Sequence, residues 1–575
     1  MMAMMRLPGL VLCLMSCAAG AAVHAESWLA WQPHEIALTG AREHPWWEFP
    51  GRASFQRQGG TESLAIEPYW DGGRRWIVRV ALPQPGIWKW QTQSDDSGLA
   101  GQSGTIEVVA PSPDQIAANP NLRGQVRIDS GRQHFEYADG TPFLLLADTL
   151  WAGNTARCGL GSREDGPFFQ HLADRKDKGF TAILMQYFHG YGDYPDSPGH
   201  RNEGGKPYLD IRSKTLNPAH FQSLDVRLRA LWDRGFVAII PATWWGKTDR
   251  CVFQPEDARR MSAYCAVRYG AFNAIWSLSG EYQYAFKDCG WKPADFTALG
   301  EEVQRHNPYR HPLSIHPSGQ ITWSPPHHVQ SSRPFHGESW LDHHWLQTGQ
   351  SVDRMFNIVT RLDENRTLRP AMPVFCSESY YERAGDPETA YHARWQVWTA
   401  LLNGAAGYGY GADGVWQFLD PADPHGETGK QTKGSVLWRE AARLPGSGQV
   451  RHARTFRDRS LRKHNDVGVF RTGFANHRLQ IREIAGHLRG GEGDVRLRGL
   501  QRLQGRRLGG LTAMELHSRL PKWAKHRMAR AGLRLGTCRP VTSNSATTMV
   551  SMSSWAAAAI RPSGAMMALC PCRSS

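Results

Sequence analysis

Residues 274–281 read Ala-Ile-Trp-Ser-Leu-Ser-Gly-Glu, and residues 372–378 read Met-Pro-Val-Phe-Cys-Ser-Glu. Each stretch is a short apolar run typical of a buried strand, and each ends in a glutamate, Glu281 or Glu378. In a (β/α)8 barrel the C-terminal ends of the strands face the active site. Two carboxylates delivered there from different strands are what glycoside hydrolysis requires, one as proton donor and one as nucleophile or base. The alternative is that both glutamates make ordinary surface contacts.

Strand-like and helix-like segments alternate between about residues 126 and 445. Helix candidates separate most of the strands, a pattern typical of parallel strands with crossover helices. A weaker eighth strand near 335–340 would complete an α/β fold, a (β/α)8 TIM barrel with insertions. A doubly wound sheet is disfavoured because no glycine-rich phosphate loop follows the first strand. The strand candidates are 143–151, 181–188, 236–244, 274–281, 311–317, 372–379 and 407–416, and the helix candidates are 167–178, 218–234, 256–269, 293–306, 352–364 and 388–402.

The segment before the barrel has a different pattern. Short alternating runs separated by Gly and Pro turns predict a small all-β sandwich over 26–112, followed by a linker over 113–125. Its strands are rich in Trp but carry no paired carboxylates, so we expect a packing or substrate-framing role. Because the linker is short, the sandwich should dock on the barrel. An independent carbohydrate-binding module is the alternative.

The first 25 residues are typical of an export signal, with a mature start near Glu26. The apolar stretch is too short to span a membrane, and we expect a periplasmic or extracellular protein. Cys17 lies in a loose lipoprotein box and offers a lipid anchor as the rival interpretation. The barrel region has five cysteines without a C-x-x-C pair, so a zinc site is not expected and the pairing stays open. Among them, Cys376 is interpreted as a packed free thiol.

The net charge of +14 is distributed unevenly. Residues 451–575 hold 24 Lys and Arg against 6 Asp and Glu, which leaves the preceding 450 residues with a net charge of −4. The body is therefore mildly acidic, and we expect no nucleic-acid partner. Residues 446–575 form an atypical, Arg-rich tail, interpreted either as a basic disordered segment or as the product of a reading-frame change near Phe456.

Residues 136–416 resemble the apiosidase-like glycoside hydrolases, glycoside hydrolase family 140 and its neighbours. The matching segments occur in the family's order and cover about half the chain, and residues 28–110 are similar to the sandwich that often precedes this barrel. Members usually carry a further β-sandwich after the barrel, where this chain has the atypical tail. The matching segments are 143–151, 179–183, 276–281, 314–317, 340–347, 377–382 and 408–416.

The resemblance implies roles for particular residues. Glu281 matches the acid/base on the fourth strand, where many relatives have Asp after Gly-Gly, and Glu378 matches the nucleophile on the seventh strand. A retaining mechanism requires the two carboxyl groups to stand about 5–5.5 Å apart. The resemblance places Asp342 and Gln347 in the lining of the pocket, in the sixth-strand loop, and Trp151 and Tyr380 lie in matching segments and are expected to bind substrate.

Other candidates have an open alternative. Asp148, after an apolar run on the first strand, is expected either to bind a sugar hydroxyl or to hold a neighbouring loop. His316 ends the fifth strand, where it either reaches the pocket or is a core histidine. Trp244 and Trp416 are candidate sugar platforms, with core packing as the alternative. The adjacent histidines His343 and His344 diverge from each other, so neither a metal nor a cofactor is expected.

These observations predict an exported glycoside hydrolase that acts on an oligo- or polysaccharide of plant type, with an apiosyl linkage of pectin suggested by the resemblance. Glu378 would attack the anomeric carbon, and Glu281 would protonate the leaving oxygen. The alternatives are a non-catalytic carbohydrate-binding surface protein and a truncated gene product without function.

Overall fold

The computed structural model describes residues 27–464, except 163, 187–200, 242–243, 247–250, 320–329, 356, 385, 387 and 421–435. The predicted export signal, the possible anchor at Cys17 and the part of the predicted tail after residue 464 lie outside these residues. Within the described part of the chain, no helix is long and apolar enough to cross a membrane.

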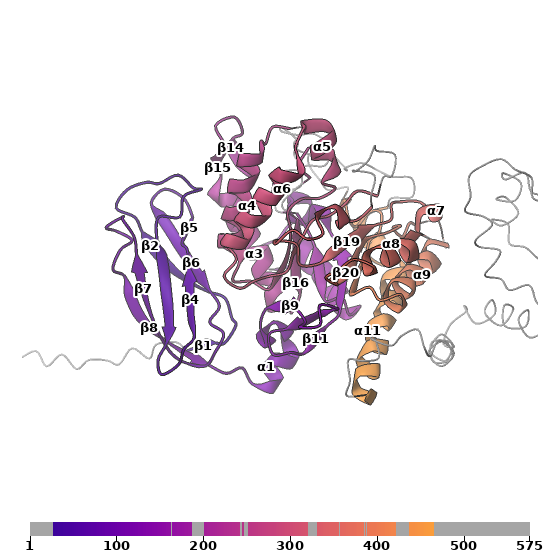
Figure 1. Cartoon of the computed structure of the whole chain (residues 1–575), viewed down its shortest axis with the longest axis horizontal. Helices are drawn as coiled ribbons and strands as arrows, with labels where there is room; N and C mark the ends of the chain where they lie inside the picture. Colours follow the sequence, from indigo (N-terminus) through magenta and orange to yellow (C-terminus); the bar gives the residue numbers. More distant parts are fainter. Residues whose placement is uncertain are drawn as a thin grey trace, which may run out of the picture. The chain divides into compact units, whose positions relative to one another are not determined.

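The N-terminal part is a sandwich of two sheets, as predicted (Figure 1). Side chains of both sheets, including Phe55, Trp76 and Trp88, form a shared core of their own. The five-stranded sheet has the order β1 (Trp28–Leu29), β8 (Ser103–Val109), β7 (Gly86–Gln93), β3 (Arg52–Arg57) and β4 (Ser63–Ile66). The three-stranded sheet has the order β2 (His34–Thr39), β6 (Arg75–Val80) and β5 (Tyr69–Trp70).

The predicted linker is structured. It forms α1 (Pro113–Ala118), which Ser112 caps together with Gln115, and the 3₁₀ helix η1 (Pro120–Arg123). Asn121 is buried, and its side-chain amide donates hydrogen bonds of 3.0 and 3.1 Å to the carbonyl oxygens of Trp232 and Phe236. The connection is therefore fixed to the barrel.

The second part is the predicted barrel, an eight-stranded sheet in which adjacent strands pair in parallel. The two end strands, β18 and β19, approach each other through bonds from the Asp342 amide to the Leu313 carbonyl and from the Ser314 hydroxyl to the His343 carbonyl, so the barrel is nearly closed. In sheet order the strands are β18 (Leu313–Ser314), β17 (Ala274–Ser277), β16 (Val237–Pro241), β13 (Ala182–Leu184), β12 (Leu145–Thr149), β21 (Gly407–Tyr410), β20 (Val374–Glu378) and β19 (His344–Gln347).

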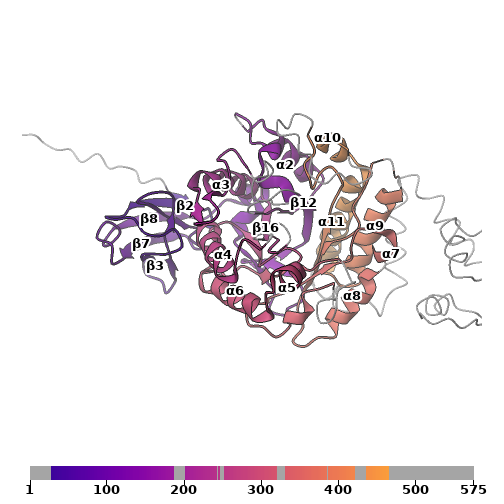
Figure 2. The ribbon, with the colours of Figure 1, turned by 90° about the horizontal axis from the view of Figure 1, so that it is seen from above.

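Helices surround these strands, as Figure 2 shows for β12 and β16. Most follow the predicted ranges, and several begin with Pro at the first turn, where its missing N–H leaves no hydrogen bond unmade. The main helices are α2 (Pro167–Asp177), α3 (Pro218–Asp233), α4 (Pro255–Tyr269), α6 (Pro293–Arg305), α7 (Val352–Met355), α8 (Asn357–Arg366), α9 (Glu388–Leu402) and α11 (Pro445–His464). Smaller elements are η2 (Trp151–Asn154), η3 (Ala156–Cys158), β14 (Tyr208–Asp210), β15 (Thr215–Leu216), α5 (Gln283–Cys289), η5 (Arg333–Phe335) and α10 (Trp438–Ala441).

The position predicted for the sixth strand is wrong. Residues 335–340 contain the end of η5 and a turn at Gly337, whose φ of 98° interrupts an extended run. The sixth strand is β19, which carries the fully buried Trp345 and Leu346. Asp342 therefore precedes this strand, and only Gln347 lies at its C-terminal end.

A small antiparallel sheet covers the N-terminal end of the barrel. It consists of β9 (Val126–Ile128), β10 (Phe135–Tyr137) and β11 (Pro142–Phe143). Its buried Val126 and Phe135 belong to the same apolar cluster as Ala147 and Val237 of the barrel interior. This end of the barrel is therefore filled by apolar packing.

The sandwich contacts the barrel through buried ion pairs. Arg79 of β6 is almost fully buried, and its guanidinium lies 2.8 Å from Glu35 of β2 and 3.0 Å from Asp225 of α3. Arg268 of α4 pairs with the same Asp225 at 2.5 Å and with Asp71 of the sandwich at 2.9 Å. Asp225 is therefore the carboxylate shared by the two buried guanidinium groups, and it links the sandwich to the barrel helices.

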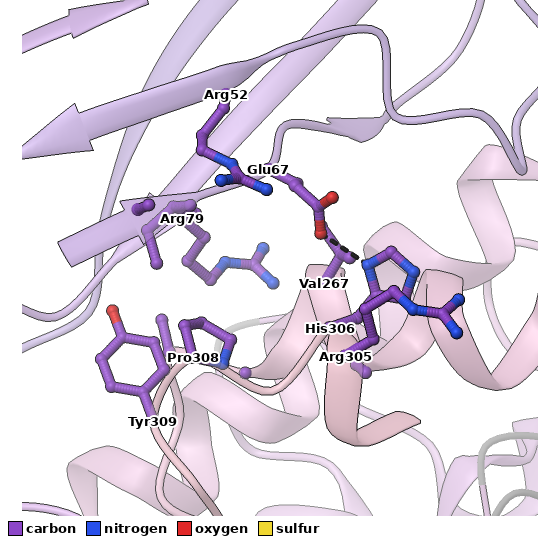
Figure 3. Close-up of a pocket in the computed structure, with 13 residues that line it drawn as sticks. Arg52, Glu67, Arg79, Val267, Arg305, His306, Pro308 and Tyr309 are labelled. Atoms are coloured by element: carbon purple, nitrogen blue, oxygen red, sulfur yellow. Dashed lines mark hydrogen bonds and ion pairs between the residues drawn. The ribbon is translucent and has the colours of Figure 1, made fainter. Parts of the chain in front are cut away.

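An open cleft with an empty volume of about 410 Å³ lies beside these ion pairs (Figure 3). Glu67 of the sandwich faces His306 across it, with 2.5 Å between Oε2 and Nδ1. Nearby, the amide of Ala81 donates a 2.7 Å hydrogen bond to the Tyr309 hydroxyl. Polar side chains thus line the seam between the sandwich and the barrel.

The barrel continues beyond the boundary predicted at residue 445. Val450 and Ala453 of α11 are buried in the main core, and the Phe456 ring lies 5.5 Å from that of Trp398. The amide of Gly446 also donates a 2.8 Å hydrogen bond to the buried Glu382 carboxylate. The first half of α11 therefore packs as a barrel helix, because its apolar residues fall on one face.

Three of the five cysteines in the barrel are free and buried, namely Cys158, Cys265 and Cys376. Burial raises the pKa of the Cys376 thiol to about 12, which agrees with the interpretation of a packed, unreactive group. Cys251 and Cys289 form a disulfide, a pairing that the sequence left open.

Candidate active site

Both glutamates lie beyond or at the C-terminal ends of barrel strands. Glu378 is the last residue of β20, and Glu281 follows the end of β17 by four residues. The carboxylates are 7% and 8% exposed, so they are largely but not completely removed from solvent. The fold thus delivers them to the end of the barrel that carries active sites in this architecture.

A β-bulge orients Glu378. The pairing between β19 and β20 runs from Leu346 opposite Cys376 directly to Gln347 opposite Glu378, so Ser377 is an extra residue. A bulge shifts the alternation of side chains by one position, and bulges often redirect a side chain next to an active site. The Ser377 hydroxyl fixes the bulge by donating a 2.8 Å hydrogen bond to the Leu346 carbonyl.

Glu378 is surrounded by hydrogen-bond donors. His316 Nε2 lies 3.0 Å from Oε2, and Gln350 Nε2 donates to Oε1 at 3.1 Å. Burial, and then the nearby Glu378 carboxylate, raises the pKa of the Tyr381 hydroxyl well above its usual value. These contacts hold the two carboxylate oxygens of Glu378 in fixed directions.

His316 has a polar contact on each ring nitrogen. Its Nδ1 lies 3.0 Å from the Ser377 hydroxyl, which also bonds the Leu346 carbonyl. Its Nε2 lies 3.0 Å from Glu378 Oε2. His316 therefore contacts both the bulge residue and the carboxylate that the bulge orients.

The Glu281 carboxylate contacts three polar side chains at longer distances than those at Glu378. Trp244 Nε1 lies 3.2 Å from its Oε2, and Oε1 lies 3.3 Å from Gln347 Nε2 and 3.4 Å from the Ser318 hydroxyl. Its backbone has a φ of 41°, a strained conformation for a residue with a side chain. The preceding Gly280 is required because a Cβ there would lie 2.2 Å from the Trp244 ring.

Aromatic rings connect the two carboxylates. Trp151, Trp244 and His316 form a triangle with ring centroids 4.5, 5.7 and 5.8 Å apart. Trp151 Nε1 also donates a 3.1 Å hydrogen bond to the hydroxyl of Tyr381. Trp244 thus contacts Glu281 while His316 contacts Glu378, so this buried ring cluster links the two carboxylates.

Trp416 lies at the edge of this group. Its ring is 8% exposed, its centroid lies 6.5 Å from that of Tyr381, and its Nε1 donates to Asp413 at 3.0 Å. The structure therefore brings together Glu281, Glu378, Trp151, Trp244, His316, Gln347 and Trp416 of the predicted site residues. Their sugar-binding roles stay predictions.

Asp148 is not part of this group. It is fully buried between β12 and α2, where its carboxylate lies 2.8 Å from His171 Nε2 and 2.9 Å from Arg175 Nε. Burial opposes ionisation, but Arg175 and His171 together hold the pKa of Asp148 below its usual value. This geometry corresponds to the structural alternative stated for Asp148.

Asp342 and Tyr380 also point elsewhere. Asp342 accepts a 2.9 Å hydrogen bond from the amide of Leu313, at the start of β18 and hence at the opposite end of the strands from Glu378. Tyr380 extends toward α9, where its ring lies 5.7 Å from that of His392, and its hydroxyl accepts a 3.1 Å hydrogen bond from Arg383. The neighbouring Tyr381 takes the place beside Glu378.

Sequence reasoning missed three residues of the site: Ser318, Gln350 and Tyr381. Tyr381 lies in one of the segments that match the family, directly after the predicted Tyr380. Ser318 and Gln350 lie in loops after β18 and β19, and no spacing or composition marks them. Among the residues that the structure describes, no three His, Cys, Asp or Glu side chains are grouped as metal ligands.

Comparison with known proteins identifies the class of this barrel. Residues 129–461 match the family described as "Apiosidase-like, catalytic domain", which is more than half of the 575 residues. The chain belongs to this family, and it is a glycoside hydrolase. Residues 28–95 match a second family, described as "Domain of unknown function (DUF5060)". No curated protein matches the chain.

Two solved structures are similar to this chain. A protein of Bacteroides vulgatus ATCC 8482, provisionally assigned to the glycoside hydrolases, has a TM-score of 0.54 and 20% identity, covering 75% of this chain and 78% of its own. A glycoside hydrolase of family 5 from the same organism has a TM-score of 0.47 and 18% identity, covering 59% of this chain and 72% of its own. At these identities the first likeness supports the fold alone, which agrees with the predicted barrel.

Proposed function

We propose that the protein cleaves its glycosidic bond by double displacement, with Glu378 as nucleophile and Glu281 as acid/base. The placement of the two carboxyl groups carries this assignment: Glu378 ends β20 and Glu281 follows β17, at the end of the barrel where active sites form. Glu378 also lies 3.0 Å from His316 Nε2 and 3.1 Å from Gln350 Nε2, which would hold a nucleophile in position. The resemblance to the apiosidase-like family supports which of the two glutamates attacks and which exchanges a proton.

In the first step a Glu378 oxygen bonds to the anomeric carbon, the bond to the leaving oxygen breaks, and the Glu281 carboxyl gives its proton to that oxygen. In the second step Glu281 takes a proton from water, whose oxygen attacks the anomeric carbon and releases Glu378. The contacts with His316 and Gln350 hold the Glu378 carboxylate as it departs in this step.

The substrate that we propose is a plant-type polysaccharide or its fragments, with an apiosyl linkage of pectin as the bond cleaved. The family description supports the sugar. We also propose that the protein is exported. The Cys251–Cys289 disulfide supports this, because disulfides persist mainly in oxidising compartments.

Hydrolysis of an aryl β-apioside and of apiose-containing pectic oligosaccharides, beside matched aryl glycosides of other sugars, tests the substrate. Release of apiose with retained anomeric configuration, followed by NMR during the first minutes, is the expected result. A 2-deoxy-2-fluoro aryl glycoside of the accepted sugar should label Glu378 covalently. An inverted product, or a label on another residue, would overturn the mechanism, and cleavage of other sugars only would overturn the substrate.

A further inference from the structure

The disulfide Cys251–Cys289 joins two segments that meet at Glu281. Cys289 is the last residue of α5, a helix that begins two residues after Glu281. Cys251 belongs to the connection between β16 and α4, which also carries Trp244. The bond closes a separation of 38 residues in sequence and joins Cys251 to the far end of the helix that follows Glu281.

The connection also packs on this segment directly. Trp244 lies against the backbone of Gly280 and donates to the Glu281 carboxylate, and Trp245 Nε1 donates a 2.9 Å hydrogen bond to the Leu278 carbonyl. A Cβ on Gly246 would lie 2.7 Å from the backbone of Ala285 in α5. Three consecutive residues, 244–246, therefore contact the chain before, at and after Glu281.

Two features make this arrangement dependent on an added constraint. The backbone of Glu281 has a φ of 41°, and such strain persists only where the surroundings over-determine the conformation. The helix α5 has only seven residues, and so short a helix is marginal without tertiary support. A covalent bond at the far end of α5 supplies such support.

We propose that Cys251–Cys289 is a positioning bond for proton transfer, holding residues 244–246 and α5 so that the Glu281 carboxyl points at the leaving oxygen. This inference rests on the acid/base role proposed for Glu281. The cysteines touch neither substrate nor carboxylate and act through Trp244 and α5. Loss of the bond should therefore impair acid catalysis more than it impairs nucleophilic attack by Glu378.

The test compares leaving groups in the double variant Cys251→Ser/Cys289→Ser. For aryl glycosides of the accepted sugar, kcat/KM should fall by about tenfold or more with a phenyl leaving group, because expulsion of phenol needs a proton. With 2,4-dinitrophenyl, which leaves without a proton, kcat/KM should change by less than about threefold. Cys265→Ala, which alters a buried thiol of α4 outside any disulfide, is the control. If it lowers kcat/KM at all, it should do so equally for both leaving groups. Equal losses for both leaving groups in the double variant would overturn the proposal.

A second measurement is independent of the sugar. Hydrogen exchange of peptides covering residues 278–285 should become faster in the double variant, while exchange in β12 and β20 stays unchanged. If that variant does not fold, the same exchange is followed in the unsubstituted protein with dithiothreitol, which reduces the bond to two thiols and itself becomes a cyclic disulfide. Unchanged exchange at 278–285 after the bond is broken would overturn the proposal. Failure of every glycoside to react would instead count against the proposed function.

Discussion

His316 Nε2 lies 3.0 Å from the Oε2 oxygen of Glu378, and its other ring nitrogen is bonded to Ser377 of the bulge that orients the same glutamate. The histidine thus bridges the bulge and the carboxylate that the bulge orients. It is a positioning residue for the proposed nucleophile.

His316→Ala removes both of these contacts. The Glu378 carboxylate then loses a hydrogen-bond partner and the bulge loses its contact with the ring, so kcat/KM should fall by about tenfold or more. Rates with aryl glycosides of the accepted sugar measure this loss. Ser377→Ala, which leaves the imidazole in place, should lower kcat/KM less, and an unchanged kcat/KM in His316→Ala would show that the contact with Glu378 is not needed for catalysis.

The two glutamates should respond differently to substitution. Glu378→Ala removes the nucleophile and should abolish turnover of every glycoside. Glu281→Ala should lower kcat/KM by about 10² to 10⁴-fold for poor leaving groups but spare 2,4-dinitrophenyl glycosides. Added azide should then restore turnover in Glu281→Ala, since azide attacks the intermediate without a general base. The reverse pattern would exchange the two roles.

Asp148 is predicted to contribute to stability and not to sugar binding. Asp148→Asn removes the fully buried counter-charge of Arg175 and leaves it only the part-exposed Asp174, which should cost about 3 kcal/mol of unfolding free energy. Urea denaturation measures the loss. The KM of the protein that remains folded should be unchanged, and a large rise in KM with normal stability would restore the sugar-binding interpretation.

Strand periodicity explains both the successes and the failures of sequence reasoning. Apolar runs ending in Glu were enough to locate the two carboxylates, because strand ends share one face of a barrel. On β12, Ala147 belongs to the barrel interior, so the next residue, Asp148, must face the helices. The sequence alone does not indicate whether the odd-numbered or the even-numbered residues of a strand face the barrel interior. The bulge at Ser377 reverses this alternation for Glu378, and the bulge is recognised only from the pairing of β19 with β20.

Loop residues were less accessible to prediction than strand residues. Gln350 bonds Glu378, the Ser379 carbonyl and the Tyr381 amide at once, but these partners meet only after β19 and β20 pair. The disulfide partners, 38 residues apart, are likewise set by packing of α5 against the connection after β16. Such contacts depend on tertiary geometry, which local pattern does not contain.

Asp342 gives a prediction for the pH dependence of stability. Burial raises the pKa of this carboxyl from 3.8 to about 6, so the folded state binds a proton more tightly than the unfolded chain does. The stability that this proton supplies is fully present below pH 3.8 and is lost as the pH rises through 6. Asp342→Asn should therefore raise the unfolding free energy at pH 7.5 by about 1 to 3 kcal/mol. Chemical denaturation at pH 5 and pH 7.5 measures this, and kcat/KM should stay unchanged because the residue lies at the opposite end of the strands.

Asp225 offers a test of the contact between sandwich and barrel. It is the shared partner of the buried Arg79 and Arg268, so Asp225→Ala leaves two guanidinium groups under-compensated and should cost about 3 to 5 kcal/mol. Arg75→Ala is the matched control, since Arg75 pairs with Asp71 from an exposed position and its removal should cost about 0 to 1 kcal/mol. Both are measured by urea denaturation at the same salt concentration. A loss in Asp225→Ala no greater than in the control would mean that the sandwich and the barrel are energetically independent, as a separate carbohydrate-binding module would be.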